Sequence, residues 1–176
     1  MSRSKSEIVS IGIFCLFVNG LILISYAVAV PFFVRGVHWL VTIAAILFIA
    51  GLPAIYHTLR KSRKRRKQSR PLGVVAALYG VGMAAIIASD ILYGLSLLGR
   101  LPHDVSYAAG NFLFILSLFG IGELGMNGAL PKWLSVFSLV TGAVGLLTYA
   151  PGTFLLQSPS LLLVGVWSFA MSFSLR

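Results

Sequence analysis

The segment Arg60-Lys61-Ser62-Arg63-Lys64-Arg65-Arg66-Lys67-Gln68-Ser69-Arg70 carries eight basic side chains among its eleven residues. It lies between two long apolar runs, so no folded core can bury it and no bilayer passes it readily. The positive-inside rule therefore keeps this segment, residues 60–70, in the cytoplasm. We expect its basic side chains to contact anionic lipid headgroups, at about 1 kcal/mol for each residue near the surface. The residues expected to do so are Arg60, Lys61, Arg63, Lys64, Arg65, Arg66, Lys67 and Arg70.

The composition indicates a polytopic membrane protein. Of the 176 residues, 58% are hydrophobic and only 10% are charged, whereas a soluble domain carries about 25% charged residues. The net charge of +10 would indicate a nucleic-acid partner in a soluble protein. Here most of the excess lies in one loop directly beside two apolar runs, so membrane lipids are the expected partners and nucleic acid is not.

The sequence offers little for catalysis or for a cofactor. The single cysteine, Cys15, excludes an internal disulfide and any CxxC motif. His38 and His57 lie at opposite ends of one apolar run, and no GxSxG, HExxH or phosphate-loop motif is present. We therefore expect no metal, no cofactor and no enzymatic activity.

Six apolar runs predict six helices within a single membrane domain, residues 1–176. The first run is longer than the roughly 7–15 residues of a signal peptide core, so it is interpreted as a retained helix. The last run is shorter than the roughly 20 residues needed to cross, unless it begins near Phe154 or the bilayer thins there. The predicted spans are residues 8–34, 36–58, 72–98, 105–126, 133–150 and 156–175. The expected fold class is an all-α transmembrane bundle.

The distribution of basic residues predicts the orientation. Of the 14 Lys and Arg residues, only Arg35 and Arg100 fall on the side opposite the basic segment, which leaves twelve on the cytoplasmic side. This bias predicts a multi-pass inner-membrane protein with both termini in the cytoplasm.

Three short motifs carry a resemblance to a known group. The second run ends in Gly51-Leu52-Pro53-Ala54-Ile55-Tyr56, and Pro71-Leu72-Gly73 opens the third. The turn Asn127-Gly128-Ala129-Leu130-Pro131-Lys132-Trp133-Leu134 is followed by Gly142. Together they resemble small six-helix bacterial integral membrane proteins of unknown function, in which LPRWL-like turns recur. The resemblance covers most of the chain, implies a six-helix bundle and brings no catalytic residues.

Asp90 is the clearest polar residue within an apolar run. It lies eight residues before Leu98, or about 12 Å below the outer end of the third run at 1.5 Å per residue. Asn111 lies six residues into the fourth run, at about 9 Å by the same measure. Because a tight turn at Gly99 to Asp104 makes these runs neighbours, we expect Asp90 and Asn111 to hydrogen-bond.

Tyrosines extend this predicted site. Tyr93 follows Asp90 by three residues and Tyr107 precedes Asn111 by four, which are spacings that share a helix face. Tyr26 reaches a similar level from the first run. One hypothesis is a ligand-binding or proton-binding pocket in the outer half of the bundle, formed by Asp90, Tyr93, Tyr107, Asn111 and Tyr26. The alternative is a polar network that only holds the helices together.

The sequence favours a non-enzymatic membrane protein that binds a lipid or small amphiphile, or that serves as an accessory subunit. The alternative is a small secondary transporter, coupled to protons through Asp90. Three spans followed by three would make the halves inverted repeats, as in many transporters. However, residues 8–98 and 105–175 show no similarity to each other.

Small residues on the third run offer a packing surface. Ala76, Gly80, Ala84 and Ala88 recur every four residues, which lets two helices approach closely. They either pack within the bundle or form a seam in a homodimer or a larger membrane complex.

Overall fold

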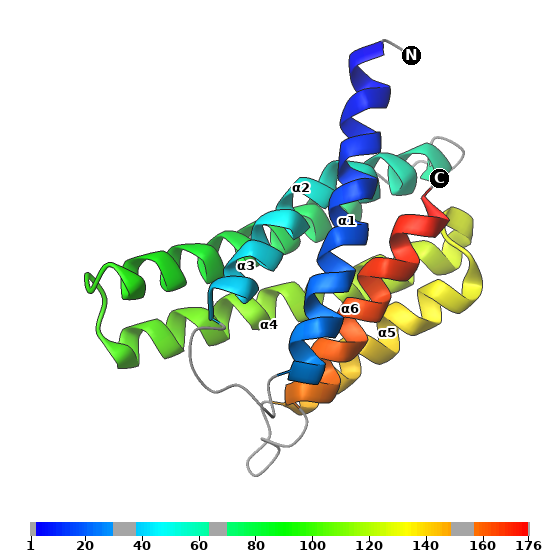
Figure 1. Ribbon diagram of the computed structural model, residues 1–176. Helices are drawn as coiled ribbons and strands as arrows, with labels where there is room; N and C mark the ends of the chain where they lie inside the picture. Colours follow the sequence, from blue (N-terminus) through cyan, green and yellow to red (C-terminus); the bar gives the residue numbers. More distant parts are fainter. Residues whose placement is uncertain (1–2, 30–37, 64–69, 149–156, 176) are drawn as a thin grey trace.

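The computed structural model describes residues 3–29, 38–63, 70–148 and 157–175 (Figure 1). These residues form six α-helices and one short π-helical segment, without a strand, which confirms the predicted all-helical class. The elements are α1 (Arg3–Ala29), α2 (His38–Arg63), α3 (Arg70–Gly94), α4 (Arg100–Leu124), η1 (Gly125–Ala129), α5 (Lys132–Leu147) and α6 (Gln157–Ser174).

Four helices are long and apolar enough to cross a membrane. Their candidate spans are Ser6–Val28, Leu40–Arg60, Pro71–Gly94 and Arg100–Ala129. The apolar stretches of α5 and α6, Lys132–Leu147 and Pro159–Ser174, are shorter. Helix α5 has 16 residues and so measures about 24 Å, against a hydrocarbon core of about 30 Å.

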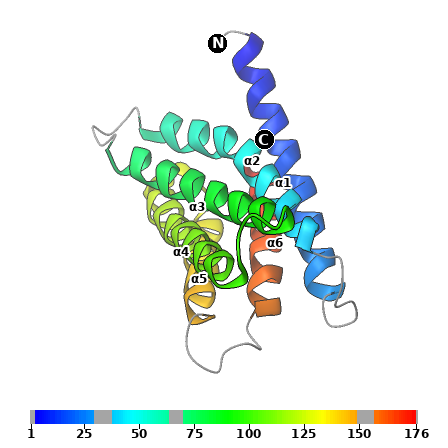
Figure 2. The same ribbon diagram turned by 90° about the vertical axis from the view of Figure 1, so that its left-hand side faces the viewer.

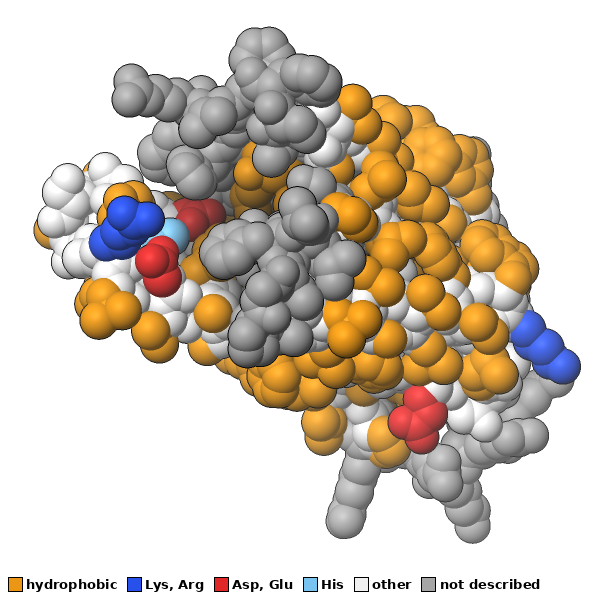
Figure 3. Space-filling model, turned by 90° about the horizontal axis from the view of Figure 1, so that it is seen from below, with side chains coloured by type: hydrophobic (Ala, Val, Ile, Leu, Met, Phe, Trp, Pro, Cys, Tyr) orange, Lys and Arg blue, Asp and Glu red, His pale blue; other side chains and the backbone are white. Residues whose placement is uncertain are grey.

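The outer surface of the described helices is largely apolar. Phe14 is 66% exposed, and Ile11, Ile43 and Val81 face outward from α1, α2 and α3. Hydrophobic side chains cover most of the described surface in Figure 3, and the charged side chains lie toward its two ends. Soluble monomers rarely expose apolar patches of such extent, so this surface agrees with a multi-pass membrane protein.

The α3–α4 hairpin projects from the rest of the bundle and crosses the direction of α1 (Figures 1 and 2). Helix α1 packs against α6 and α2, and α4 packs against α3 and α5. The first residues of α1 and the last residues of α6 lie toward the same end of the molecule.

The turn between α3 and α4 lies at residues 95–99, which corrects the predicted turn at Gly99 to Asp104. Helix α3 ends at Gly94, and Ser96 adopts a left-handed conformation with φ 57°. The backbone N–H of Leu97 donates to Leu92 O in this turn, as chain-reversing bonds do at helix ends. Helix α4 then begins at Arg100, and its first turn accommodates Pro102 because an N–H there has no helical partner.

Aromatic rings from four helices form the centre of the core. Phe48 of α2 lies 5.1 Å from Phe114 of α4 and 6.4 Å from Trp167 of α6, between ring centroids. Tyr79 of α3 completes the group and donates its hydroxyl to Phe48 O at 3.0 Å. The Trp167 Nε1–H donates to Ser138 Oγ at 2.6 Å, so the buried polar atoms of this cluster are paired.

Helices α3 and α4 approach most closely at Gly82 and Gly110. A Cβ added at Gly82 would lie 2.7 Å from Gly110 O, so only glycine fits. The predicted small-residue stripe is not this seam, because Ala84 and Ala88 are exposed and a Cβ at Gly80 would meet nothing closer than 3.8 Å. The packing glycine lies two positions from the stripe, and spacing alone does not distinguish the two faces.

Candidate functional site

A cavity of about 630 Å³ lies between the six helices. Its walls include the aromatic rings of Phe48 and Phe114, and polar side chains line the part that contains Asp90 and His103. The polar and titratable residues that line it are Tyr26, Asp90, Arg100, His103, Asp104, Tyr107, Asn111, Thr141, Thr148 and Ser160. A lining that combines apolar and polar groups suits an amphiphilic ligand.

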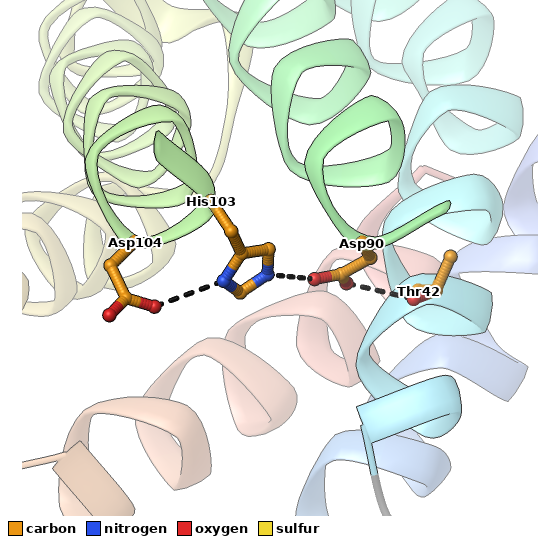
Figure 4. A network of polar contacts seen from close by, with 4 residues as sticks. All are labelled: Thr42, Asp90, His103 and Asp104. Atoms are coloured by element: carbon orange, nitrogen blue, oxygen red, sulfur yellow. Dashed lines mark hydrogen bonds and ion pairs between the residues drawn. The ribbon is translucent and has the colours of Figure 1, made fainter. Parts of the chain in front are cut away.

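The polar end is organised around Asp90, near the C-terminal end of α3 (Figure 4). Thr42 of α2 donates its hydroxyl to Asp90 Oδ2 at 2.8 Å. His103 of α4 places Nε2 3.1 Å from Asp90 Oδ1, and its Nδ1 lies 3.0 Å from Asp104 Oδ1. Three helices therefore converge on one carboxylate.

The His103 ring lies between two carboxylates, and this geometry bears on its protonation. A neutral imidazole has one N–H and donates one hydrogen bond, whereas an imidazolium donates from both nitrogens. With both carboxylates ionised, only the imidazolium satisfies the contacts to Asp90 and Asp104. The side chains of Asp90 and His103 are 11% and 17% exposed, so this pair is shielded, while Asp104 is 59% exposed.

Two tyrosine rings hold the imidazole in place. The centroid of Tyr93 lies 4.5 Å from that of His103, and the centroid of Tyr107 lies 5.8 Å away. Both tyrosine rings are tilted relative to the imidazole, with interplanar angles of 33° and 32°. The faces of aromatic rings attract cations, so this setting also favours a charged imidazole.

The structure does not join Asp90 to Asn111, which corrects the predicted hydrogen bond. Gly82 and Gly110 lie opposite each other in the antiparallel hairpin. Asp90 lies eight residues after Gly82 on α3, so the residue at its level on α4 lies eight residues before Gly110. That residue is Pro102, next to His103. Asn111 lies on the other side of this crossing, so the two polar side chains are separated along the helices by about 13 Å.

Four of the five residues predicted for the pocket line the cavity, namely Asp90, Tyr26, Tyr107 and Asn111. Tyr93 is instead 45% exposed and stacks on His103.

Sequence reasoning missed Thr42 and His103. Pro102 could have indicated the position of His103, because proline favours the first turn of a helix and so predicts that α4 already includes His103. His103 and Tyr107 are four residues apart and would then share a helix face.

Two further predictions concern headgroup contacts and metals. Arg60 is exposed near the end of α2, and the side chains of residues 61–70 lie outside the part that the structure describes. Among the described residues, no group of three His, Cys, Asp or Glu side chains has the arrangement of a metal site. His103 separates Asp90 from Asp104, so the three do not converge on a common point.

Comparison of the chain with protein-family models, with curated proteins and with solved structures gives no match.

Proposed function

We propose that the protein is a six-span inner-membrane protein with both termini in the cytoplasm, which binds a lipid or small amphiphile and catalyses no reaction. The observation that carries this proposal is the cavity of about 630 Å³ with an apolar wall and a shielded polar end at Asp90. Ligand pockets for small molecules measure about 300–1,000 Å³, so a ligand of moderate size fits.

The types of side chain that line the cavity support an amphiphilic ligand. Phe48, Phe114 and Leu23 supply apolar surface for a hydrocarbon tail. Asp90 and Tyr26 supply hydrogen-bonding groups for a head, at the level where α3 ends. A ligand with an apolar tail and a polar head partitions into the membrane and can enter the cavity from there.

Topology rests on helix length and charge. Four helices have the length and composition of spans, and α5 and α6 are apolar but shorter. Both ends of the basic segment adjoin long apolar helices, α2 and α3, which supports a position of its charges at the membrane surface. Binding of anionic headgroups there would anchor the cytoplasmic face.

Native mass spectrometry of the protein gently extracted from membranes tests the proposal. We expect a retained mass of lipid-like size on the wild-type chain. Ala108→Trp places a large ring in the cavity wall and should remove that mass, whereas Ala109→Trp alters the adjacent exposed residue and should keep it. A bare wild-type chain, or retention in both variants, would contradict the proposal, and co-extraction of other polypeptides would instead indicate an accessory subunit.

A second candidate is a secondary transporter coupled to protons, and the contact between His103 and Asp90 favours it. A histidine changes its charge near neutral pH, and here it lies on a shielded carboxylate beside a cavity. The test is proton movement in proteoliposomes when the amphiphile found by mass spectrometry is added. Asp90→Asn should abolish that movement, and a wild-type protein that moves no protons excludes this candidate.

A further inference from the structure

We propose that the bound amphiphile carries a positively charged head, which lies beside Asp90 and exchanges with the proton of His103. This inference rests on the proposed function and adds the ligand's charge and its coupling to one proton.

Asp90 has spare capacity for a cationic partner. An ionised carboxylate has about four lone-pair sites, and the described structure occupies two of them, with Thr42 and His103, so part of its negative charge remains open to contact with a cation. The carboxylate lines the cavity, so a ligand head reaches it from there. A shielded carboxylate attracts a cation more strongly than an exposed one, because less water screens the interaction.

The surroundings of Asp90 favour a cation over an anion. Tyr26 and Tyr107 line the cavity near this end, and aromatic faces stabilise ammonium groups. Arg100 is the only lysine or arginine lining the cavity in the described part of the chain. Its side chain is 87% exposed and lies 3.9 Å from Asp104, so it leaves Asp90 without a fixed positive partner other than His103.

Charge balance links ligand binding to the proton on His103. A protonated His103 neutralises Asp90, and Arg100 offsets the charge of the exposed Asp104. An added cation would therefore leave an excess positive charge in the shielded site, which costs free energy. Release of the His103 proton to water removes that excess, and the neutral ring keeps one of its two hydrogen bonds. In the described residues, the other titratable and charged groups that face the pair of Asp90 and His103 are Tyr93 from α3, Arg100, Asp104 and Tyr107 from α4, and Tyr26 from α1.

The experiment uses the full chain in lipid nanodiscs and two probes with the same alkyl chain. Dodecyltrimethylammonium is permanently cationic, and 1-dodecanol is neutral. Calorimetry in buffers of different ionisation enthalpy counts the protons released on binding, and the Ala108→Trp variant reports partition into the lipid alone. We expect the ammonium probe to release up to one proton at pH 5.5. Its affinity should rise by up to about tenfold per pH unit while His103 titrates, because one cation replaces one proton.

Two variants separate the roles of the pair. His103→Gln keeps an N–H for Asp90 but does not titrate, so it should bind the ammonium probe without proton release or pH dependence. Asp90→Asn should lose the preference for the cation and still bind 1-dodecanol, which shows that it is folded. If wild type binds 1-dodecanol but not the cation, or binds the cation without releasing a proton, this inference is overturned and the proposed function stands. If neither probe binds beyond the Ala108→Trp level, the proposed function fails as well.

Discussion

Replacement of Gly82 by alanine tests the helix crossing that sets the level of Asp90 against His103. The new Cβ would lie 2.7 Å from Gly110 O and 2.8 Å from Phe114 N. An ordinary contact is 3.4 Å or more, so the helices must separate by about 0.7 Å, since both obstacles are backbone atoms. Overpacking of this kind costs about 1–3 kcal/mol.

The matched control is Gly80→Ala on the same helix. Its Cβ would meet only Leu52 Cδ2, at 3.8 Å, so the added methyl group fits. Both substitutions gain about 0.5–1 kcal/mol of helix propensity, and the difference between them isolates the contact with α4. We expect Gly82→Ala to be less stable than Gly80→Ala by about 1–3 kcal/mol in SDS-titration unfolding followed by circular dichroism. Equal stability of the two variants would show that α3 and α4 do not cross at Gly82.

Three further predictions address packing and topology. Trp167→Phe removes the donor to Ser138 Oγ from a buried site and should lower the free energy of unfolding by about 1–3 kcal/mol, measured by the same titration. Asn19→Leu removes the buried hydrogen bond from Asn19 Nδ2 to Ser168 Oγ but also removes the buried Oδ1, which has no partner in the described structure, so the two effects should offset each other to within about 1 kcal/mol; a loss greater than this would contradict that balance. In a Cys15→Ala background, Ser69→Cys should react with an impermeant maleimide only from the cytoplasmic side and Ser96→Cys only from the outside, and the reverse pattern would refute the orientation.

The helical class followed from hydropathy because the apolar runs are long and the basic segment interrupts them clearly. Helix ends were harder to predict where the turn itself is apolar. Leu95, Leu97 and Leu98 continue the hydrophobic pattern of α3, yet the backbone reverses at Ser96. Composition does not distinguish such a turn from another helical turn, so the third run was predicted four residues too long.

That shift in the turn changed the partner assigned to Asp90. Asp90 lies four residues before the end of α3, or about 6 Å, and His103 lies three residues after the start of α4, or about 4.5 Å. These depths match, whereas the depth predicted for Asn111 depended on a fourth run beginning at Val105. Asp90 itself was identifiable because a carboxylate in an apolar run is costly unless it is paired.

The ends of the two shorter helices contribute to the cavity. Helices α3 and α4 have 25 residues each, whereas α5 has 16 and α6 has 18, so the shorter pair covers only part of the hairpin. Thr148, just beyond α5, and Ser160, in the first turn of α6, both line the cavity. The final run, which is shorter than the roughly 20 residues needed to cross a bilayer, therefore contributes Ser160 to the site.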